Sequence, residues 1–295
     1  MRSAASTTPE MYDDRRAAVR ASSQGDGRPG CRSASSPGCG ARRYPVGGME
    51  PTIPLVLAEV LANGFALAEA VVDRALVGRL RRDVDAALAA ERRWFPPGDD
   101  QYGRLLFAPV HGGAFIDLLG DDELFAPIEA VIPGGIVYTM TTSVLRPGEI
   151  GPISDYHRDF PIDRPSGLAL AAMVLLDPFS ARSGATEFIA GSHLDETEAG
   201  AGAREPIRLT GSPGDVCYFD PKVLHRARRN GSQGSRRSVL VQMIQPWMKQ
   251  RVDVREMLRS VPAAPGPAAC RRLGRDSLPP GTYDEFAARR ADRPW

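Results

Sequence analysis

The fold is indicated most clearly by residues 135–160, which read GIVYTMTTSVLRPGEIGPISDYHRDF. The ten apolar, β-branched and hydroxyl residues 136–145 predict a strand, and the Pro-Gly pair at 147–148 marks a turn after it. The stretch ends with His157 and Asp159, two positions apart. Because alternate residues of an extended segment point to the same side, these two side chains would share one face.

Short β-type runs continue downstream, each bounded by Pro, Gly, Asp or Ser: 168–176, 186–189, 207–209, 215–219 and 238–244. Many short strands between turn signals are typical of a β-sandwich or jelly roll. Upstream, apolar residues at helical spacing predict a helix over residues 67–93 and a second helix over 122–131. We therefore expect a mainly β protein with flanking helices.

The two ends of the chain differ from this central region. Residues 1–48 are rich in Ser, Arg, Gly and Ala without apolar periodicity, which predicts a disordered extension. Residues 49–250 are expected to form the folded domain, with its β core over about 136–247. Residues 251–295 are expected to be a partly disordered tail, with one amphipathic helix over 282–292.

The net charge of +1 is uneven, because residues 1–48 and 249–295 each carry +4 and leave −7 on residues 49–248. An acidic folded domain is a poor electrostatic match to nucleic acid. The apolar stretches are too short to span a bilayer, and no secretory signal is recognised. Four separated cysteines without a CxxC pair favour a reducing, cytoplasmic location.

A third candidate metal ligand, His225, follows the segment GDVCYFD at 214–220, which indicates a turn, a short apolar strand and a polar exit. Two imidazoles and one carboxylate suit ferrous iron and leave three coordination positions open. With 4 histidines and 36 acids, about half a His-x-acid triplet is expected by chance, so the pair His157 and Asp159 alone does not establish a site.

A candidate anion site follows the third histidine. On a strand that begins near residue 236, Arg236 and Ser238 would share one face and Arg237 would point outward. A buried arginine beside a hydroxyl suits a carboxylate, because the guanidinium can bond it bidentately. By the same alternation Arg158 points away from His157, where it is either solvated or a contact for an anionic substrate.

These features together resemble the phytanoyl-CoA dioxygenase family of iron(II)- and 2-oxoglutarate-dependent oxygenases. The resemblance covers about residues 138–247, with weaker agreement back to about residue 49. Its most specific pieces are four ordered motifs: YHRDF at 156–160, SGATEFIAGSH at 183–193, GDVCYFD at 214–220 leading into LH at 224–225 and Asn230, and RRS at 236–238.

The resemblance implies a double-stranded β-helix, a jelly roll of cupin type, with helices packed on its larger sheet. It implies that His157, Asp159 and His225 bind Fe(II), and that Arg236 pairs with the distal carboxylate of 2-oxoglutarate. Ser238 and Thr186 are expected to supply hydroxyls near this co-substrate. The implied reaction uses O2 to hydroxylate or otherwise oxidise a C–H bond of a small metabolite or natural-product intermediate, with release of succinate and CO2.

The sequence departs from the family pattern at Ala227, where relatives often have a serine, at Met173, which is aromatic in some relatives, and at Ala190, which replaces a usual proline. These departures concern the finer co-substrate contacts. Two other functions stay open: a cupin-like metalloenzyme that needs no 2-oxoglutarate, and a non-catalytic β-helix binding module. Substrate identity and oligomeric state are not readable.

Several other side chains have two interpretations. His193 is expected to be structural rather than a fourth ligand, and His111 is either a plain loop histidine or a substrate contact. Alternate residues of the first strand share one face that is either pocket lining or ordinary core: Tyr138, Met140, Thr142 and Val144. Specificity is expected to reside in the loops, mainly 95–117, 160–167 and 194–206.

Overall fold

A computed structural model describes residues 43–45, 49–95, 103–151, 154–197, 204–259, 261, 265–277 and 279–291. All of these residues lie in one compact unit of the chain. Within those ranges, no helix combines the length and the apolar character needed to cross a lipid bilayer.

The larger sheet has six strands in the order β1-β2-β7-β4-β9-β3. All neighbouring strands run antiparallel except β1 and β2, which are parallel. Its strands are β1 (Arg43–Pro45), β2 (Phe65–Glu69), β3 (Ile136–Leu145), β4 (Ala169–Leu175), β7 (Val216–Phe219) and β9 (Arg236–Ile244). The decisive stretch of sequence thus begins with β3, which is one edge of this sheet.

The smaller sheet has three strands in the order β6-β5-β8, namely β6 (Ile207–Arg208), β5 (Glu187–Phe188) and β8 (His225–Arg226). A buried aromatic cluster joins its inner face to the larger sheet. Phe188 of β5 stacks on Phe65 with ring centroids 4.5 Å apart and lies 5.5 Å from Phe219. Two sheets packed face to face through such a core form the predicted jelly-roll, double-stranded β-helix architecture.

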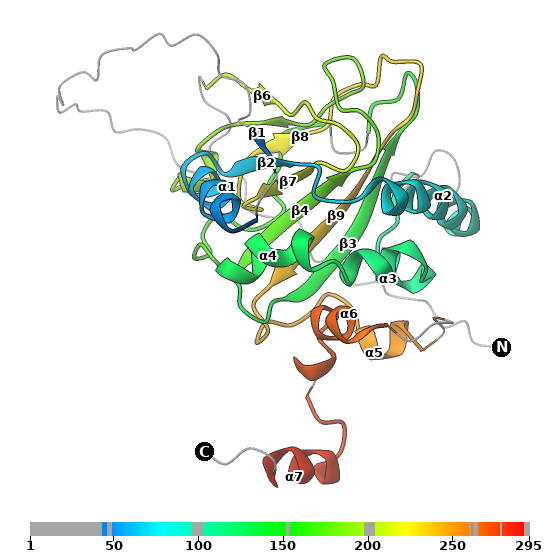
Figure 1. Ribbon diagram of the computed structural model, residues 1–295, viewed down its shortest axis with the longest axis vertical. Helices are drawn as coiled ribbons and strands as arrows, with labels where there is room; N and C mark the ends of the chain where they lie inside the picture. Colours follow the sequence, from blue (N-terminus) through cyan, green and yellow to red (C-terminus); the bar gives the residue numbers. More distant parts are fainter. Residues whose placement is uncertain are drawn as a thin grey trace, which may run out of the picture. The chain divides into compact units, whose positions relative to one another are not determined.

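Four helices cover the outer face of the larger sheet: α1 (Met49–Asn63), α2 (Arg74–Glu91), α3 (Ala114–Leu119) and α4 (Asp122–Val131), as Figure 1 shows. They share one hydrophobic core with that face, to which β9 contributes Val239, Val241 and Met243. The intervening β9 residues therefore point into the space between the sheets. The helices expected on the larger sheet are present, and α4 has the predicted bounds.

The predicted helix over 67–93 is wrong in its first part. Leu67 belongs to β2, where it is fully buried between the sheets and pairs with Cys217 of β7. The helix α2 begins only after Asp73, whose carboxylate caps it by accepting hydrogen bonds from the amides of Ala75 and Leu76. Burial on both faces gave β2 a continuous apolar run, which periodicity cannot distinguish from a helix.

The domain boundaries also differ from the prediction. Residues 1–42 lie outside the described residues, but 43–45, expected to be disordered, form β1 beside β2. After residue 250 the chain forms α5 (Val254–Met257), α6 (Pro267–Arg272), η3 (Arg275–Ser277) and α7 (Tyr283–Ala291). Val254, Ala269 and Leu273 are buried in the main core, so part of the expected tail belongs to the domain. The helix α7 matches the predicted amphipathic segment.

Candidate metal centre and co-substrate pocket

The backbone around β8 brings the two distant histidines together. His157 and His225 form an antiparallel bridge in which each amide donates to the other's carbonyl at 3.1 Å. Two residues further, the amide of Asp159 donates to the carbonyl of Pro221 at 2.8 Å. The segment before Phe160 is therefore held against the strand that carries His225, and alternation directs His157 and Asp159 to the same side.

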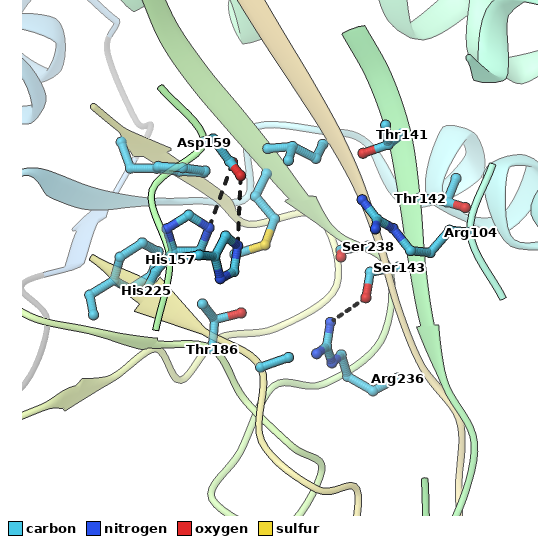
Figure 2. Close-up of a pocket in the computed structure, with 15 residues that line it drawn as sticks. Arg104, Thr141, Thr142, Ser143, His157, Asp159, Thr186, His225, Arg236 and Ser238 are labelled. Carbon is cyan, nitrogen blue, oxygen red and sulfur yellow. Dashed lines mark hydrogen bonds and ion pairs between the residues drawn. The ribbon is translucent and has the colours of Figure 1, made fainter. Parts of the chain in front are cut away.

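The side chains of these three residues converge on one point (Figure 2). The Oδ1 atom of Asp159 lies 3.7 Å from Nε2 of His157, and its Oδ2 atom lies 3.6 Å from Nε2 of His225. One ligand atom from each residue lies within 4.8 Å of the others. This is the spacing of three donors around a single ion rather than of a hydrogen-bonded cluster.

Backbone contacts orient both imidazoles for metal binding. The Nδ1 atom of His157 lies 2.9 Å from the carbonyl oxygen of Asp155, and Nδ1 of His225 lies 3.0 Å from that of Val223. A carbonyl accepts only from a protonated Nδ1, which leaves each Nε2 with a free lone pair directed toward Asp159. Orientation of this kind is usual for histidines that bind metals.

Burial favours the neutral form of His225. Its ring packs against Phe219 at 5.2 Å and Phe188 at 5.7 Å between centroids. Burial is the main cause that lowers the pKa of His225, and the neighbouring His157 adds to it while the Asp159 carboxylate opposes it. A neutral imidazole is the form that ligates a metal. The side chains of His157 and Asp159 are about a quarter exposed, so the convergence point is open on their side.

Arg236, at the start of β9, occupies the same pocket and is 1 % exposed. It donates from Nη2 to the carbonyl of Gly184 at 3.1 Å and from Nη1 to Oγ of Ser143 at 3.4 Å, and its guanidinium lies over the Phe179 ring. Among the described residues its Nε has no hydrogen-bond partner. Burial lowers the pKa of Arg236 to about 10, with Asp177 acting in the opposite direction, so it stays protonated at neutral pH.

The carbonyl that accepts from Arg236 depends on a glycine. Gly184 has φ of +77°, and a Cβ at this position would lie 2.5 Å from the carbonyl oxygen of Arg228. No other residue fits there without displacing the backbone. The SGAT motif at 183–186 therefore fixes the position of the guanidinium.

The pocket between the triad and Arg236 has a volume of about 660 Å³, including the part open to solvent. Ser238 and Thr186 both line it, as does the hydroxyl of Ser143. Ala227 and Met173, two departures from the family pattern, line it with apolar atoms instead. The remaining lining residues are Arg104, Thr141, Thr142, Phe188, Phe219 and Leu240.

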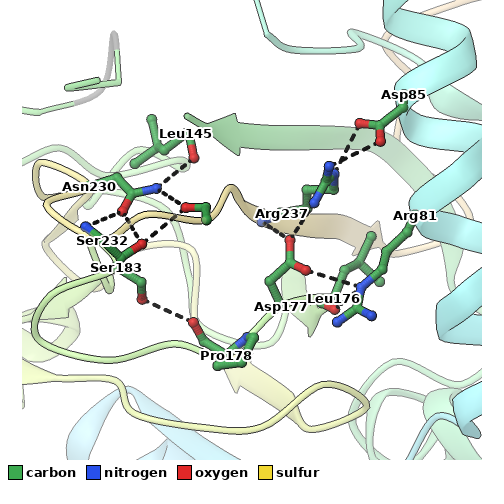
Figure 3. Close-up of polar contacts among 11 residues, drawn as sticks. Arg81, Asp85, Leu145, Leu176, Asp177, Pro178, Ser183, Asn230, Ser232 and Arg237 are labelled. Carbon is green, nitrogen blue, oxygen red and sulfur yellow. Dashed lines mark hydrogen bonds and ion pairs between the residues drawn. The ribbon is translucent and has the colours of Figure 1, made fainter. Parts of the chain in front are cut away.

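The neighbouring arginine has a different role from the one expected for an exposed charge. Arg237 points to the outer face, where Nη1 pairs with Asp177 at 2.9 Å and Nη2 with Asp85 of α2 at 3.0 Å (Figure 3). Its side chain is only 19 % exposed. Arg237 thus points outward as predicted, and in addition its ion pairs tie a covering helix to the sheet.

Arg158 does point away from the triad, but it is neither solvated nor available to a substrate. Its side chain is 4 % exposed and donates to the backbone carbonyls of Ser192 and Lys222. It therefore braces the turn before His225. A carbonyl partner on a distant loop leaves no sign in the sequence, so alternation predicted the direction of this side chain but not its contacts.

The other two histidines lie outside the pocket lining. His193 is buried and contacts the carbonyl of Leu61 at 3.1 Å, as expected for a structural residue. His111 pairs with Glu91 at 2.7 Å. Of the four alternate β3 residues expected to be pocket lining or core, Thr142 lines the pocket, Met140 and Val144 belong to the main core, and Tyr138 packs against a smaller cluster. Thr141 and Ser143 also line the pocket. The sequence interpretation did not identify these two hydroxyls, nor Arg104, because no motif marks them.

Comparison with known proteins gives a family. A family model described as phytanoyl-CoA dioxygenase matches residues 61–238. Two curated relatives are the uncharacterized proteins Mb1539 of Mycobacterium bovis and Rv1501 of Mycobacterium tuberculosis, each 28% identical over 121 residues. The match covers 40% of this chain and 44% of each relative, so the chain spans less than half the length of the curated relatives it matches.

Solved structures agree on the fold. SnoN, a non-heme alpha ketoglutarate dependent epimerase from nogalamycin biosynthesis, is 19% identical with a TM-score of 0.57, over 73% of this chain and 90% of its own. AviO1 from Streptomyces viridochromogenes Tue57 is 20% identical with a TM-score of 0.57, over 69% of this chain and 99% of its own. Since the family match extends over more than half of the residues, the chain belongs to the phytanoyl-CoA dioxygenase family.

Proposed function

We propose that this chain is an iron(II)- and 2-oxoglutarate-dependent oxygenase that attacks a C–H bond of a small molecule. One observation carries the proposal: a single pocket has two imidazoles and a carboxylate converging at one end and a buried arginine at the other. The two imidazoles and the carboxylate fit a divalent metal ion, and the arginine fits a carboxylate. 2-Oxoglutarate is a ligand that would use both a metal ion and such an arginine. A reducing, cytoplasmic setting would keep the iron ferrous.

His157, Asp159 and His225 would hold the iron through two Nε2 atoms and one carboxylate oxygen. Their side chains approach from one side, since His157 and Asp159 lie on a segment that is bridged to His225 of β8. The arrangement fits the facial set of two histidines and one carboxylate, which leaves the opposite face for other ligands. The carbonyls of Asp155 and Val223 would keep both imidazoles in the ligand tautomer.

Arg236 would pair with the distal carboxylate of 2-oxoglutarate. The guanidinium is protonated, enclosed and partly committed to a carbonyl and a hydroxyl, so its remaining N–H groups have one defined direction. The hydroxyls of Ser238 and Thr186 line the same pocket and would assist. Ala227 removes one hydroxyl that relatives often supply, so more of the binding would depend on Arg236.

Bound iron with 2-oxoglutarate and O2 supplies the oxidant for a C–H bond, while the co-substrate is converted to succinate and CO2. This chain's residues position the reactants and limit access of water. Phe188, Phe219 and Leu240 supply apolar walls beside the triad. SnoN is an alpha ketoglutarate dependent epimerase, so the proposal extends to C–H attack in general and not to hydroxylation alone.

Metal-dependent succinate formation tests the proposal. The purified protein is loaded with Fe(II) without oxygen, supplied with 2-oxoglutarate and O2, and assayed with a metabolite panel. We expect succinate release that requires both iron and 2-oxoglutarate and that is absent in Asp159→Ala. A product formed with iron but without 2-oxoglutarate would favour the cupin-like alternative. Failure to bind iron at all would favour the non-catalytic module.

A further inference from the structure

A turn at residues 220–223 contacts both segments that carry the proposed metal ligands. The carbonyl of Pro221 accepts from the amide of Asp159 at 2.8 Å, and the carbonyl of Val223 lies 3.0 Å from Nδ1 of His225. The turn thus holds the backbone of one ligand and the ring of another, and Figure 2 shows that both side chains converge. A shift of this turn would therefore move two of the three donors.

Arg158 anchors this turn on the side away from the pocket. It lies between two ligands in the sequence, and alternation turns its side chain away from them. Its Nη1 donates both to the carbonyl of Lys222 in the turn and to that of Ser192 at 2.7 Å, and its Nη2 lies 3.6 Å from the carboxylate of Asp195. The guanidinium therefore ties the turn to a second segment, residues 192–195.

The second segment is itself fixed against the strand that carries His225. Oγ of Ser192 accepts at 2.7 Å from the amide of Leu224, the residue before that histidine, and the amide of Ile189 donates to the carbonyl of Leu224 at 2.9 Å. Ser192 is fully buried, and the Arg158 side chain is 4 % exposed. Both anchor points of the guanidinium thus belong to the scaffold around His225.

An arginine suits this position for a physical reason. A buried carbonyl that loses its donor is costly, and one guanidinium can serve acceptors on two segments at once. Without Arg158, the carbonyls of Ser192 and Lys222 would lose a shared donor, and the turn would no longer be held to residues 192–195. Groups that orient metal ligands typically change metal affinity by about 10–100-fold when they are removed.

We propose that Arg158 is a positioning residue for the metal centre. It acts through the turn at 220–223 on the ring of His225 and on the backbone of Asp159, while its own side chain points away from the metal position. The inference rests on the proposed function, because it takes these side chains as the metal ligands.

The tautomer of each imidazole tests the inference in the metal-free protein. His157 is a comparison within the same molecule, because its Nδ1 contacts the carbonyl of Asp155, which lies outside the turn. Wild type is compared with Arg158→Met, which removes the donors and keeps an apolar stem. Nitrogen NMR of histidine-labelled protein at about pH 8 reports the tautomers. In Arg158→Met, His225 should change from a single Nδ1–H tautomer to a mixture, whereas His157 should keep its tautomer.

Metal affinity is the second measurement. Anaerobic titration should show that Arg158→Met binds Mn(II) about 10-fold more weakly than wild type, or worse. The matched control is Arg272→Met, because Arg272 is also buried, donates to the carbonyl of Leu119 at 2.8 Å and pairs with Asp122. Both variants should lower the melting temperature, but Arg272→Met should keep the Mn(II) affinity within about 3-fold.

An unchanged His225 tautomer together with wild-type Mn(II) affinity in Arg158→Met would make the arginine purely structural and would overturn the inference. Equal losses of affinity in Arg158→Met and Arg272→Met would overturn it as well, since instability alone would then explain the weaker binding.

If Arg158→Met does not fold, Arg158→Lys replaces it. A single ammonium on a shorter stem does not reproduce the guanidinium contacts, so we expect Mn(II) affinity at least about 3-fold below wild type. Wild-type affinity in this variant would contradict the inference. If wild type itself binds no Mn(II), the proposed function fails, whereas the tautomer comparison needs no metal and still decides whether Arg158 orients His225.

Discussion

Two carboxylates on opposite sides of the smaller sheet have contrasting surroundings. Glu187, on the outer side, is 3 % exposed and pairs with Arg208 and Arg226 at 2.9 Å and with Arg228 at 3.6 Å. Asp159, on the pocket side, has two ion-pair contacts within the described part of the chain, both to imidazoles that lie beyond hydrogen-bond distance. Among the described residues, three arginines neutralise the first carboxylate, whereas no arginine or lysine pairs with the second, which fits the proposed metal ion.

Neighbouring residues on the same strands produce this difference. Glu187 and Phe188 are consecutive on β5, as are His225 and Arg226 on β8, so each short strand turns one of its two side chains into the pocket and the other outward. The outer face therefore collects arginines around Glu187, and the inner face collects the imidazoles. A carboxylate that is fully paired with cationic side chains therefore indicates a role in stability. A carboxylate without such pairing indicates a candidate functional site.

The largest expected effect is on metal binding. Asp159→Ala should weaken Fe(II) or Mn(II) binding by at least about 100-fold, since changes to groups that merely orient ligands already cost 10–100-fold. Glu187→Gln should leave metal affinity within about 3-fold, because Glu187 lies outside the pocket lining. His193→Ala should behave like Glu187→Gln. Anaerobic metal titration measures all three, and loss of metal in His193→Ala with retention in Asp159→Ala would mean that the triad is misassigned.

The next effect concerns co-substrate affinity and the two faces of β9. Arg236→Ala should raise the dissociation constant of 2-oxoglutarate by about 30-fold to several-thousand-fold, because the distal carboxylate would be left enclosed and unpaired. Arg237→Ala should change it less than about 3-fold, although it breaks the link between Asp177 and Asp85. Titration of 2-oxoglutarate into the metal-loaded variants measures the difference. Equal effects in the two variants would contradict the proposed role of Arg236.

A smaller effect is expected on the stability of the metal-free protein. Here the Glu187 variant should lose more than the Asp159 variant, the reverse of their order in metal binding. Glu187→Gln should lower the free energy of unfolding by about 1.5–3 kcal/mol, the usual value for hydrogen bonds to a charged group. Asp159→Asn should change it by no more than about 0.5 kcal/mol, because no arginine or lysine of the described residues pairs with that carboxylate in the metal-free protein. Urea unfolding of the metal-free proteins measures both. A larger loss in Asp159→Asn than in Glu187→Gln would reverse the comparison.

The smallest effect is the pH dependence of that stability difference. Burial acts to raise the pKa of Glu187, but the hydrogen bonds from Arg208 and Arg226 and the charge of Arg228 outweigh it, so the pKa lies below its usual 4.5. Since the unfolded state binds the proton first as the pH falls, the contribution of Glu187 is complete above pH 4.5 and declines below it. Unfolding of wild type and Glu187→Gln between pH 7 and pH 3 should therefore converge. A gap that widens on acidification would contradict the assigned contacts.

Much of the β core was predictable because its strands carry local signals. The bounds of β3 and α4 agree with the sequence prediction, and the RRS motif indicated correctly which of two adjacent arginines faces inward. β2 was not predictable, because a strand buried on both faces has no alternation. Of the helices after residue 250, α7 was predicted, whereas α5 and α6 were missed because their few apolar residues become significant only once they meet the core.

The sequence by itself determined the architecture class and the three side chains that converge. Strand alternation and the order of motifs are local properties that can be read directly from the sequence. Only the tertiary structure decided the partners of each charge. It buried Arg158 against two carbonyls, paired Arg237 with α2, surrounded Glu187 with arginines and turned Arg104 into the pocket. The physical reason is that a polar group's role depends on which donors and acceptors lie within about 3 Å, and those come from residues far apart in the chain.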